Sequence, residues 1–298
     1  MPGIVAGALT AHPPILLREV GGDESDRLAA TTQAFAELDA ALTGVPADLV
    51  IMISPHGPAM IDELPVRLVP RASGHLARFG APRVALDVPV DLELAQALVR
   101  AARADGFRVS PCDDRGLDHG TMVPLWLLPR TRAGKRFVFI GICGWSRARL
   151  LAFGEWLHGC LADRSAILIA SGDLSHRLTE AAPYGFREEG RVFDERVIEA
   201  LRSSEWEGIA SLDADTVEAA GECGLRPLTI LLGAARAAGL RSEVLSYEGP
   251  FGVGYPVATF NAATPDYDVA ALARSAIAGY LERRETIAPP EPIPAALR

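Results

Sequence analysis

Two histidines occupy matching places in the sequence, each shortly after a run of apolar residues. The run "IVAGAL" (residues 4–9) precedes His12, and "LVIMIS" (residues 49–54) precedes His56. Prolines follow or flank both histidines. Because proline removes a backbone donor and disfavours a continued strand, we expect each histidine to lie at the tip of a buried strand.

A third apolar run ends in residues that can also do chemistry. The run "AILIAS" (residues 166–171) is followed by Asp173 and His176. In open α/β sheets, ligands bind in the crevice beyond the carboxyl ends of the strands. We therefore expect His12, His56 and His176 to converge on one edge of a sheet.

This set of residues suits a catalytic metal ion. Two imidazoles and one carboxylate, with open coordination positions, are typical of Fe(II) enzymes that activate O₂, while three ligands and a water also suit catalytic zinc. Glu222, in "ECGLRPL" just ahead of an apolar helix, is the expected third ligand, and Asp173 competes with it. His119 lies in "LDHGTMVPL", which has the pattern of a loop entering a helix.

The elements that must position these residues alternate along the chain. Residues 136–142 form a further apolar run, and helical periodicity fills the intervals between the runs. This alternation predicts an α/β fold with a central parallel or mixed β-sheet flanked by helices. The expected helices cover residues 28–42, 94–102, 148–162, 187–202 and 226–238.

The domain organisation follows from the absence of repeats and linkers before the C-terminal end. We expect one domain over residues 1–285, closing with a helix from Tyr267 to Glu285. Residues 286–298 are rich in proline and read as a tail.

Composition excludes several classes of function. The net charge of -9 and the lack of a basic cluster argue against a nucleic-acid partner. The four cysteines are scattered without a paired motif, which is typical of a reducing, cytoplasmic compartment. No apolar stretch reaches the roughly 18 residues of a membrane span, and the N-terminus lacks the pattern of a signal peptide.

Six motifs in a fixed order carry a resemblance to a known family. The chain resembles the class III (LigB-type) extradiol ring-cleavage dioxygenases, near the Memo and AMMECR1-associated branch, from the first strand to about Phe260. The motifs are "AHPPIL", "SPHGP", "LDHGTMVPL", "SGDLSHRL", "ECGLRPL" and "SYEGPFGVGYPVATF".

The resemblance implies roles for individual residues. His12 and His56 match the two histidine ligands of the ferrous ion, and Glu222 falls where the carboxylate ligand is expected. His176 matches the acid-base histidine, and His119 matches a histidine that helps to hold substrate or oxygen. Asp173 and Asp118 then orient imidazoles.

One segment departs from a simple match. The Memo branch is associated with a cysteine in a similar segment, and here Glu222 and Cys223 are adjacent. Neighbouring side chains at a helix start point in different directions, so only one of the two is expected to face the metal. We expect Glu222 to do so.

The resemblance implies an Fe(II)-dependent extradiol dioxygenase that opens a catechol-type ring with O₂. Two alternatives are a Memo-like protein that serves metal-linked redox chemistry or partner binding, and a zinc hydrolase with the same ligands. Both a homo-oligomer and a separate small subunit are compatible with the resemblance.

Overall fold

Four of the strands lie side by side and run parallel. The computed structural model describes residues 3–262, and the fold concerns this part of the chain. The order across the sheet is β1 (Gly3–Thr10), β10 (Ser165–Ser171), β2 (Leu49–Ile53) and β8 (Arg136–Ile140). Their side chains are buried on both faces, which explains why the sequence shows continuous apolar runs.

Further strands extend this sheet on both sides and make it mixed. On one side β12 (Tyr255–Ala262) pairs antiparallel with β1, and β11 (Leu240–Glu248) pairs antiparallel with β12. On the other side β4 (Leu64–Arg67) is antiparallel to β8 and parallel to β7 (Val109–Cys112). The eight-stranded sheet confirms the predicted α/β fold with a mixed central sheet.

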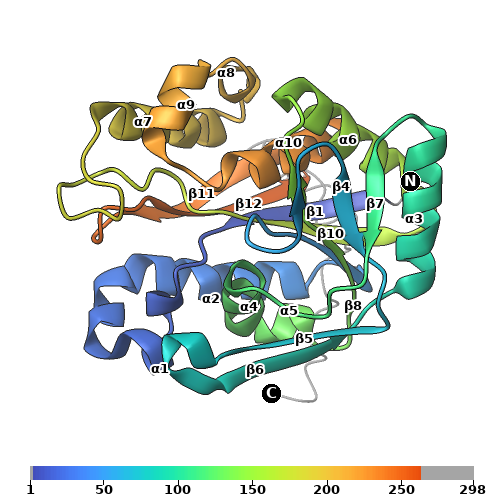
Figure 1. The fold of residues 1–298 in the computed structure, drawn as a ribbon, viewed down its shortest axis with the longest axis horizontal. Helices are drawn as coiled ribbons and strands as arrows, with labels where there is room; N and C mark the ends of the chain where they lie inside the picture. Colours follow the sequence, from blue (N-terminus) through green and yellow to red (C-terminus); the bar gives the residue numbers. More distant parts are fainter. Residues whose placement is uncertain (1–2, 263–298) are drawn as a thin grey trace, which may run out of the picture. The chain divides into compact units, whose positions relative to one another are not determined.

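Helices cover both faces of the sheet (Figure 1). One face packs against α6 (Arg147–Cys160) and α10 (Leu225–Ala238), and the other against α2 (Ala29–Thr43) and α4 (His119–Leu127). Two separate clusters of buried apolar side chains fill the spaces between the layers. Burial of this apolar area is the main force that holds the layers together.

The remaining elements are short or lie toward the edges. The helices are α1 (Arg18–Gly21), α3 (Leu92–Ala104), α5 (Pro129–Arg132), α7 (Glu188–Ser203), α8 (Glu207–Ala210) and α9 (Ala214–Ala220). Two small sheets pair β3 (Ala59–Met60) with β9 (Ile142–Cys143) and β5 (Arg71–Leu76) with β6 (Ala81–Pro89). Three 3₁₀ helices are η1 (Pro14–Leu16), η2 (Gly22–Leu28) and η3 (Ala77–Phe79).

The predicted helices match α2, α3, α6, α7 and α10 to within a few residues. The expected strand over residues 136–142 is shorter, because the chain leaves the main sheet after Ile140 and its next residues pair with β3 as β9. The expected helix from Tyr267 to Glu285 and the tail over residues 286–298 lie outside the described residues, so the predicted domain end stays a prediction.

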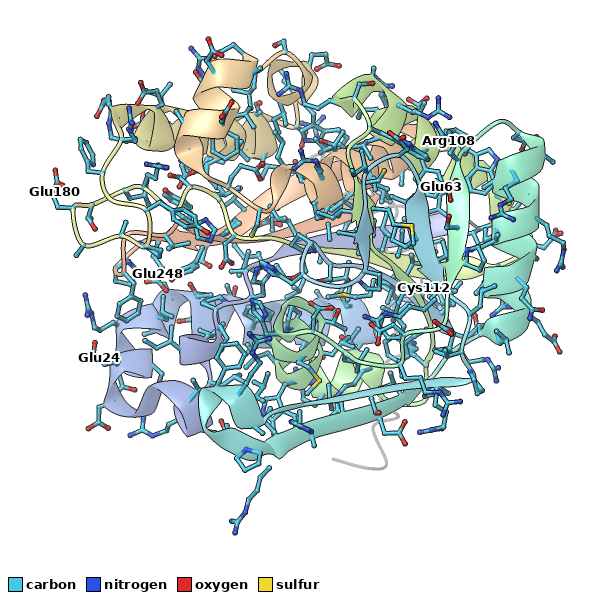
Figure 2. All side chains as sticks on the ribbon, in the orientation of Figure 1. Glu24, Glu63, Arg108, Cys112, Glu180 and Glu248 are labelled. Atoms are coloured by element: carbon cyan, nitrogen blue, oxygen red, sulfur yellow. The ribbon has the colours of Figure 1, made fainter. Side chains whose placement is uncertain are left out.

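Two partly buried hydrogen bonds connect the edge strand β11 to α2. The Glu248 carboxylate accepts hydrogen bonds from the amide nitrogen of Thr31, at 2.8 Å, and from its hydroxyl, at 2.6 Å. Figure 2 shows Glu248 at the end of β11, next to the start of α2. The loop between β11 and β12 is thereby anchored at its first end.

Among residues 3–262, every helix is too short or too polar to pass through a lipid bilayer.

Candidate metal centre

Three histidine side chains gather at the carboxyl edge of the parallel strands. One ring nitrogen from each of His12, His56 and His119 lies within 4.8 Å of the others. The Nε2 atoms of His12 and His56 are 3.0 Å apart. Within the described residues, these three form the group of side chains with the spacing of metal ligands.

Strand order brings the histidines together. Because β10 lies between β1 and β2, the segments that follow these three parallel strands leave the sheet at the same edge. His12 comes two residues after β1, His56 three residues after β2, and Asp173 two residues after β10. The prediction that the strand tips meet is confirmed for His12 and His56.

The ring of His12 is held in one tautomer by Ser171. The Ser171 hydroxyl donates to the Gly120 carbonyl oxygen at 2.5 Å, so it accepts from Nδ1 of His12 at 2.7 Å. Nε2 of His12 is then unprotonated and turned toward His56. Burial, followed by the neighbouring His56, lowers the pKa of His12 to about 3, so this nitrogen is available as a ligand at neutral pH.

His119 is placed by the start of α4. Asp118 caps this helix, since its carboxylate accepts from the amide nitrogen of Thr121 at 3.1 Å and from the hydroxyl of Ser54 at 2.5 Å. The His119 ring stacks on His56 with centroids 4.3 Å apart, and burial lowers the pKa of His119 to about 3. Asp118 therefore fixes the helix start rather than bonding to an imidazole directly.

Asp173 holds the backbone of His12. Its Oδ1 accepts from the amide nitrogen of His12 at 2.8 Å, and its Oδ2 lies 3.8 Å from Nε2 of the same residue. Burial raises the pKa of Asp173 to about 6. This carboxylate links the segment after β10 to the segment after β1.

The structure places Cys223, and not Glu222, beside the histidines. Sγ of Cys223 lies 3.6 Å from Nε2 of His12 and accepts the amide hydrogen of Asp173 at 3.3 Å. The close approach depends on Gly172 and Gly224: a Cβ on Gly172 would lie 2.1 Å from Cα of Gly224. Two glycines are therefore needed for the two loops to touch.

Glu222 has a different environment. Its carboxylate accepts the amide hydrogen of Leu225 at 2.6 Å, at the start of α10, and burial raises its pKa. It lines a cavity of about 620 Å³ together with Arg147 and Arg226. Its oxygens are not among the ligand atoms that gather around His12.

His176 presents one basic nitrogen. Its Nδ1 contacts the Leu174 carbonyl oxygen at 2.9 Å, and because a carbonyl only accepts, Nδ1 carries the proton. Nε2 is left as an acceptor. A protonated His176 would help to lower the pKa of His12, so the two rings lie within electrostatic reach of each other.

The donor set fits a transition metal. Two nitrogens bound at about 2.1 Å to one ion lie about 3.0 to 3.4 Å apart, depending on the angle at the metal. The 3.0 Å between Nε2 of His12 and Nε2 of His56 falls in this range. Imidazole nitrogens suit zinc, iron and copper.

Sequence reasoning missed Ser171, which fixes the His12 tautomer. Its signal is a polar residue at the end of an apolar strand that precedes a glycine. It also missed Asp194, a buried carboxylate on α7, which no spacing pattern connects to the histidines.

Comparison with known proteins gives the family. Residues 6–258 match the family described as the catalytic LigB subunit of aromatic ring-opening dioxygenase. The chain belongs to the LigB family. Metal dependence is typical of the LigB family, in agreement with the cluster of three histidines.

Two relatives extend this picture. Protein CA_C1420 of Clostridium acetobutylicum is 34% identical over 269 residues, a match that covers 87% of this chain. The match spans 58% of the length of that curated relative. The crystal structure of the uncharacterized protein JW3007 from Escherichia coli K12 has a TM-score of 0.62 at 19% identity, with 86% of this chain and 99% of that chain covered, and it supports the fold.

Proposed function

We propose that this member of the LigB family is an Fe(II)-dependent extradiol dioxygenase that opens a catechol-type ring with O₂. The observation that carries the proposal is the pair of Nε2 atoms of His12 and His56, 3.0 Å apart at the edge where three parallel strands end. LigB membership supplies the reaction class, and His176, whose Nδ1 bonds to the Leu174 carbonyl oxygen, supplies a group for proton transfer.

We assign the metal to His12 and His56 as ligands. Fe(II) bound there would orient the two substrate hydroxyls and O₂ and let electron density pass between them. For the third ligand, the geometry favours His119 or Cys223 over the predicted Glu222, whose carboxylate is held by the amide of Leu225.

The chain's own residues have separable tasks. Nε2 of His176, unprotonated while Nδ1 bonds to Leu174, accepts the proton of a catechol hydroxyl and later returns it. Asp173 fixes the backbone of His12, and Ser171 keeps the ring turned with Nε2 inward. The stacked ring of His119 narrows the space next to His56 and so limits how a flat substrate enters.

The test is O₂ uptake by Fe(II)-loaded protein with a panel of substituted catechols, read together with the absorbance of the ring-opened products. Uptake with product formation, lost in His176→Ala while iron remains bound, is the expected result. No uptake from stoichiometrically loaded protein across the panel would count against the dioxygenase. Release of acid and alcohol from ester substrates by Zn²⁺-loaded protein, measured separately, distinguishes a hydrolase.

A second candidate is a Memo-like protein with a metal-linked redox role. The specific observation in its favour is the thiol of Cys223, 3.6 Å from Nε2 of His12, in place of a carboxylate. Under this alternative, Cys223→Ala abolishes the redox response of the bound metal, whereas ring cleavage is absent from the wild type as well.

A further inference from the structure

A chain of hydrogen bonds leads from a half-buried tyrosine to His176. The Tyr247 hydroxyl donates to Oδ2 of Asp194 at 2.6 Å, and Oδ1 of Asp194 accepts the amide hydrogen of Ser175 at 2.8 Å. The Leu174 carbonyl oxygen accepts from Nδ1 of His176 at 2.9 Å. This carbonyl and the Ser175 amide belong to one planar peptide group. Asp194 and the imidazole therefore bind opposite ends of the same unit.

A carboxylate at the N–H end of a peptide group strengthens the acceptor at its C=O end. Hydrogen bonds in a chain polarise one another, and the effect is larger in a dry interior. A stronger acceptor at Leu174 favours the proton on Nδ1 of His176 and stabilises the charged imidazolium. Asp194 can thus act on His176 without touching it.

We propose that Asp194, supported by Tyr247, is a positioning residue that sets the tautomer and basicity of His176 through the peptide group between Leu174 and Ser175. This inference rests on the acid-base role proposed above for His176. It adds two residues that lie outside the histidine cluster and outside every motif used to assign the metal ligands.

The surroundings hold this peptide group firmly. The amide nitrogen of Leu174 donates to the Gly254 carbonyl oxygen at 2.8 Å, and the Gly254 amide donates to the Ser175 carbonyl oxygen at 2.8 Å. The Ser175 hydroxyl donates to the Ala220 carbonyl oxygen at 3.0 Å. These hydrogen bonds fix the position of the peptide group, and a fixed position is required for it to transmit the effect of Asp194 to His176.

Glycine at position 254 permits the approach of Asp194. A Cβ there would lie 2.1 Å from Oδ2 of Asp194, closer than any side chain allows. The glycine-rich segment "YEGPFGVGY", residues 247–255, supplies both Tyr247 and Gly254. The glycine-rich segment therefore holds the loop that carries His176 in place, through Tyr247 and Gly254.

Asp194 carries its charge above neutral pH. Burial raises the pKa of Asp194 to about 7, and the hydrogen bonds from Tyr247 and Ser175 oppose that rise. Measurements at pH 8 therefore compare a charged carboxylate in the wild type with a neutral amide in Asp194→Asn, which keeps the size of the side chain and an oxygen acceptor for Ser175.

The experiment is long-range ¹H–¹⁵N NMR of the histidine rings in the full chain loaded with diamagnetic Zn²⁺, at pH 8. In the wild type we expect His176 with its proton mainly on Nδ1. In Asp194→Asn the ratio of the Nδ1–H to the Nε2–H tautomer falls about threefold or more. Tyr247→Phe, which leaves the carboxylate in place, gives a smaller fall in the same direction.

The control is Asp39→Asn, which changes a buried carboxylate whose hydrogen bonds go to Arg130 and Thr131. We expect it to lower stability without changing the His176 tautomer. An unchanged His176 ratio in folded Asp194→Asn and Tyr247→Phe overturns the proposal. If the wild type cleaves aromatic rings, we expect kcat of Asp194→Asn and Tyr247→Phe to fall with the His176 tautomer ratio while KM stays unchanged. If the tautomer ratio changes in these variants but the wild type has no ring-cleavage activity, the role of Asp194 is supported and the proposed function is refuted.

Discussion

The sulfur of Cys223 lies 3.6 Å from Nε2 of His12, while the carboxylate of the preceding residue, Glu222, accepts the amide hydrogen of Leu225, the first residue of α10. The two side chains leave the backbone in different directions, so two adjacent residues have different surroundings, one beside the histidines and one at the start of a helix. Substitutions at Cys223 should therefore change metal binding, whereas substitutions at Glu222 should not.

His12→Ala and His56→Ala should each weaken metal binding more than about a hundredfold, because each removes a nitrogen of the facing pair. Glu222→Gln should leave metal affinity within about threefold of the wild type, since the amide oxygen can still accept from Leu225. Equilibrium dialysis with metal analysis measures both. Loss of metal in Glu222→Gln would restore the carboxylate as the third ligand.

Cys223→Ser should remove the thiolate-to-metal charge-transfer band from the absorption spectrum of the metal-loaded protein. If Cys223 binds the ion, Co²⁺-loaded wild type shows a sulfur-to-metal charge-transfer band in the near ultraviolet, and the serine variant lacks it while Co²⁺ stays bound to the histidines. An absence of this band in the wild type would exclude Cys223 as the third ligand. Cys160→Ser, at an exposed cysteine, is the matched control.

Gly172→Ala should disrupt the contact between the two loops that bring Asp173 and Cys223 together. The added methyl group would lie 2.1 Å from Cα of Gly224, so we expect a loss of about 3 kcal/mol in the free energy of unfolding. Gly159→Ala, within α6 and with open space around the new methyl group, should be neutral or slightly stabilising. Urea unfolding of both variants provides the comparison, and equal stability would argue against the contact.

Asp194→Asn should change how stability depends on pH. The pKa of Asp194 is raised to about 7 in the folded chain, so the folded state binds this proton more tightly than the unfolded state. Its contribution to stability is therefore full below about pH 4 and falls as the pH rises through 7, by about 1.4 kcal/mol for each unit of pKa shift. Asparagine lacks this dependence.

The free energy of unfolding of Asp194→Asn minus that of the wild type should accordingly rise between pH 4 and pH 8. Urea titrations at four pH values across this range measure it. A difference that stays constant, or falls with pH, would show that the folded pKa of Asp194 is not raised.

Continuous apolar runs made the centre of the fold predictable. Strands buried on both faces, such as those with the apolar runs 49–53 and 166–170, have no polar positions within the run, and the residues that follow them then lie at a known edge. Strands β4 and β7 were missed because each has four residues that include proline and a polar side chain, so no run or alternation marks them.

The third ligand position was harder to predict than the first two. Sequence shows that Glu222 and Cys223 diverge, but which one faces His12 depends on the contact between Gly172 and Gly224, which are 52 residues apart in sequence. The tautomer of His12 likewise depends on Ser171, whose hydroxyl is committed to Gly120. Such long-range contacts leave no local pattern.

The strand order has a consequence for how the protein folds as it is synthesised. β10 lies between β1 and β2, yet it is made more than a hundred residues after either of them. On the ribosome, β1 and β2 therefore cannot pair with their shared partner, β10, until residues 165–171 emerge and insert between them. Such late, non-local pairing slows folding and leaves strand edges exposed in the nascent chain. The two facing imidazoles consequently meet only after this insertion, which makes metal uptake a direct kinetic reporter of sheet closure.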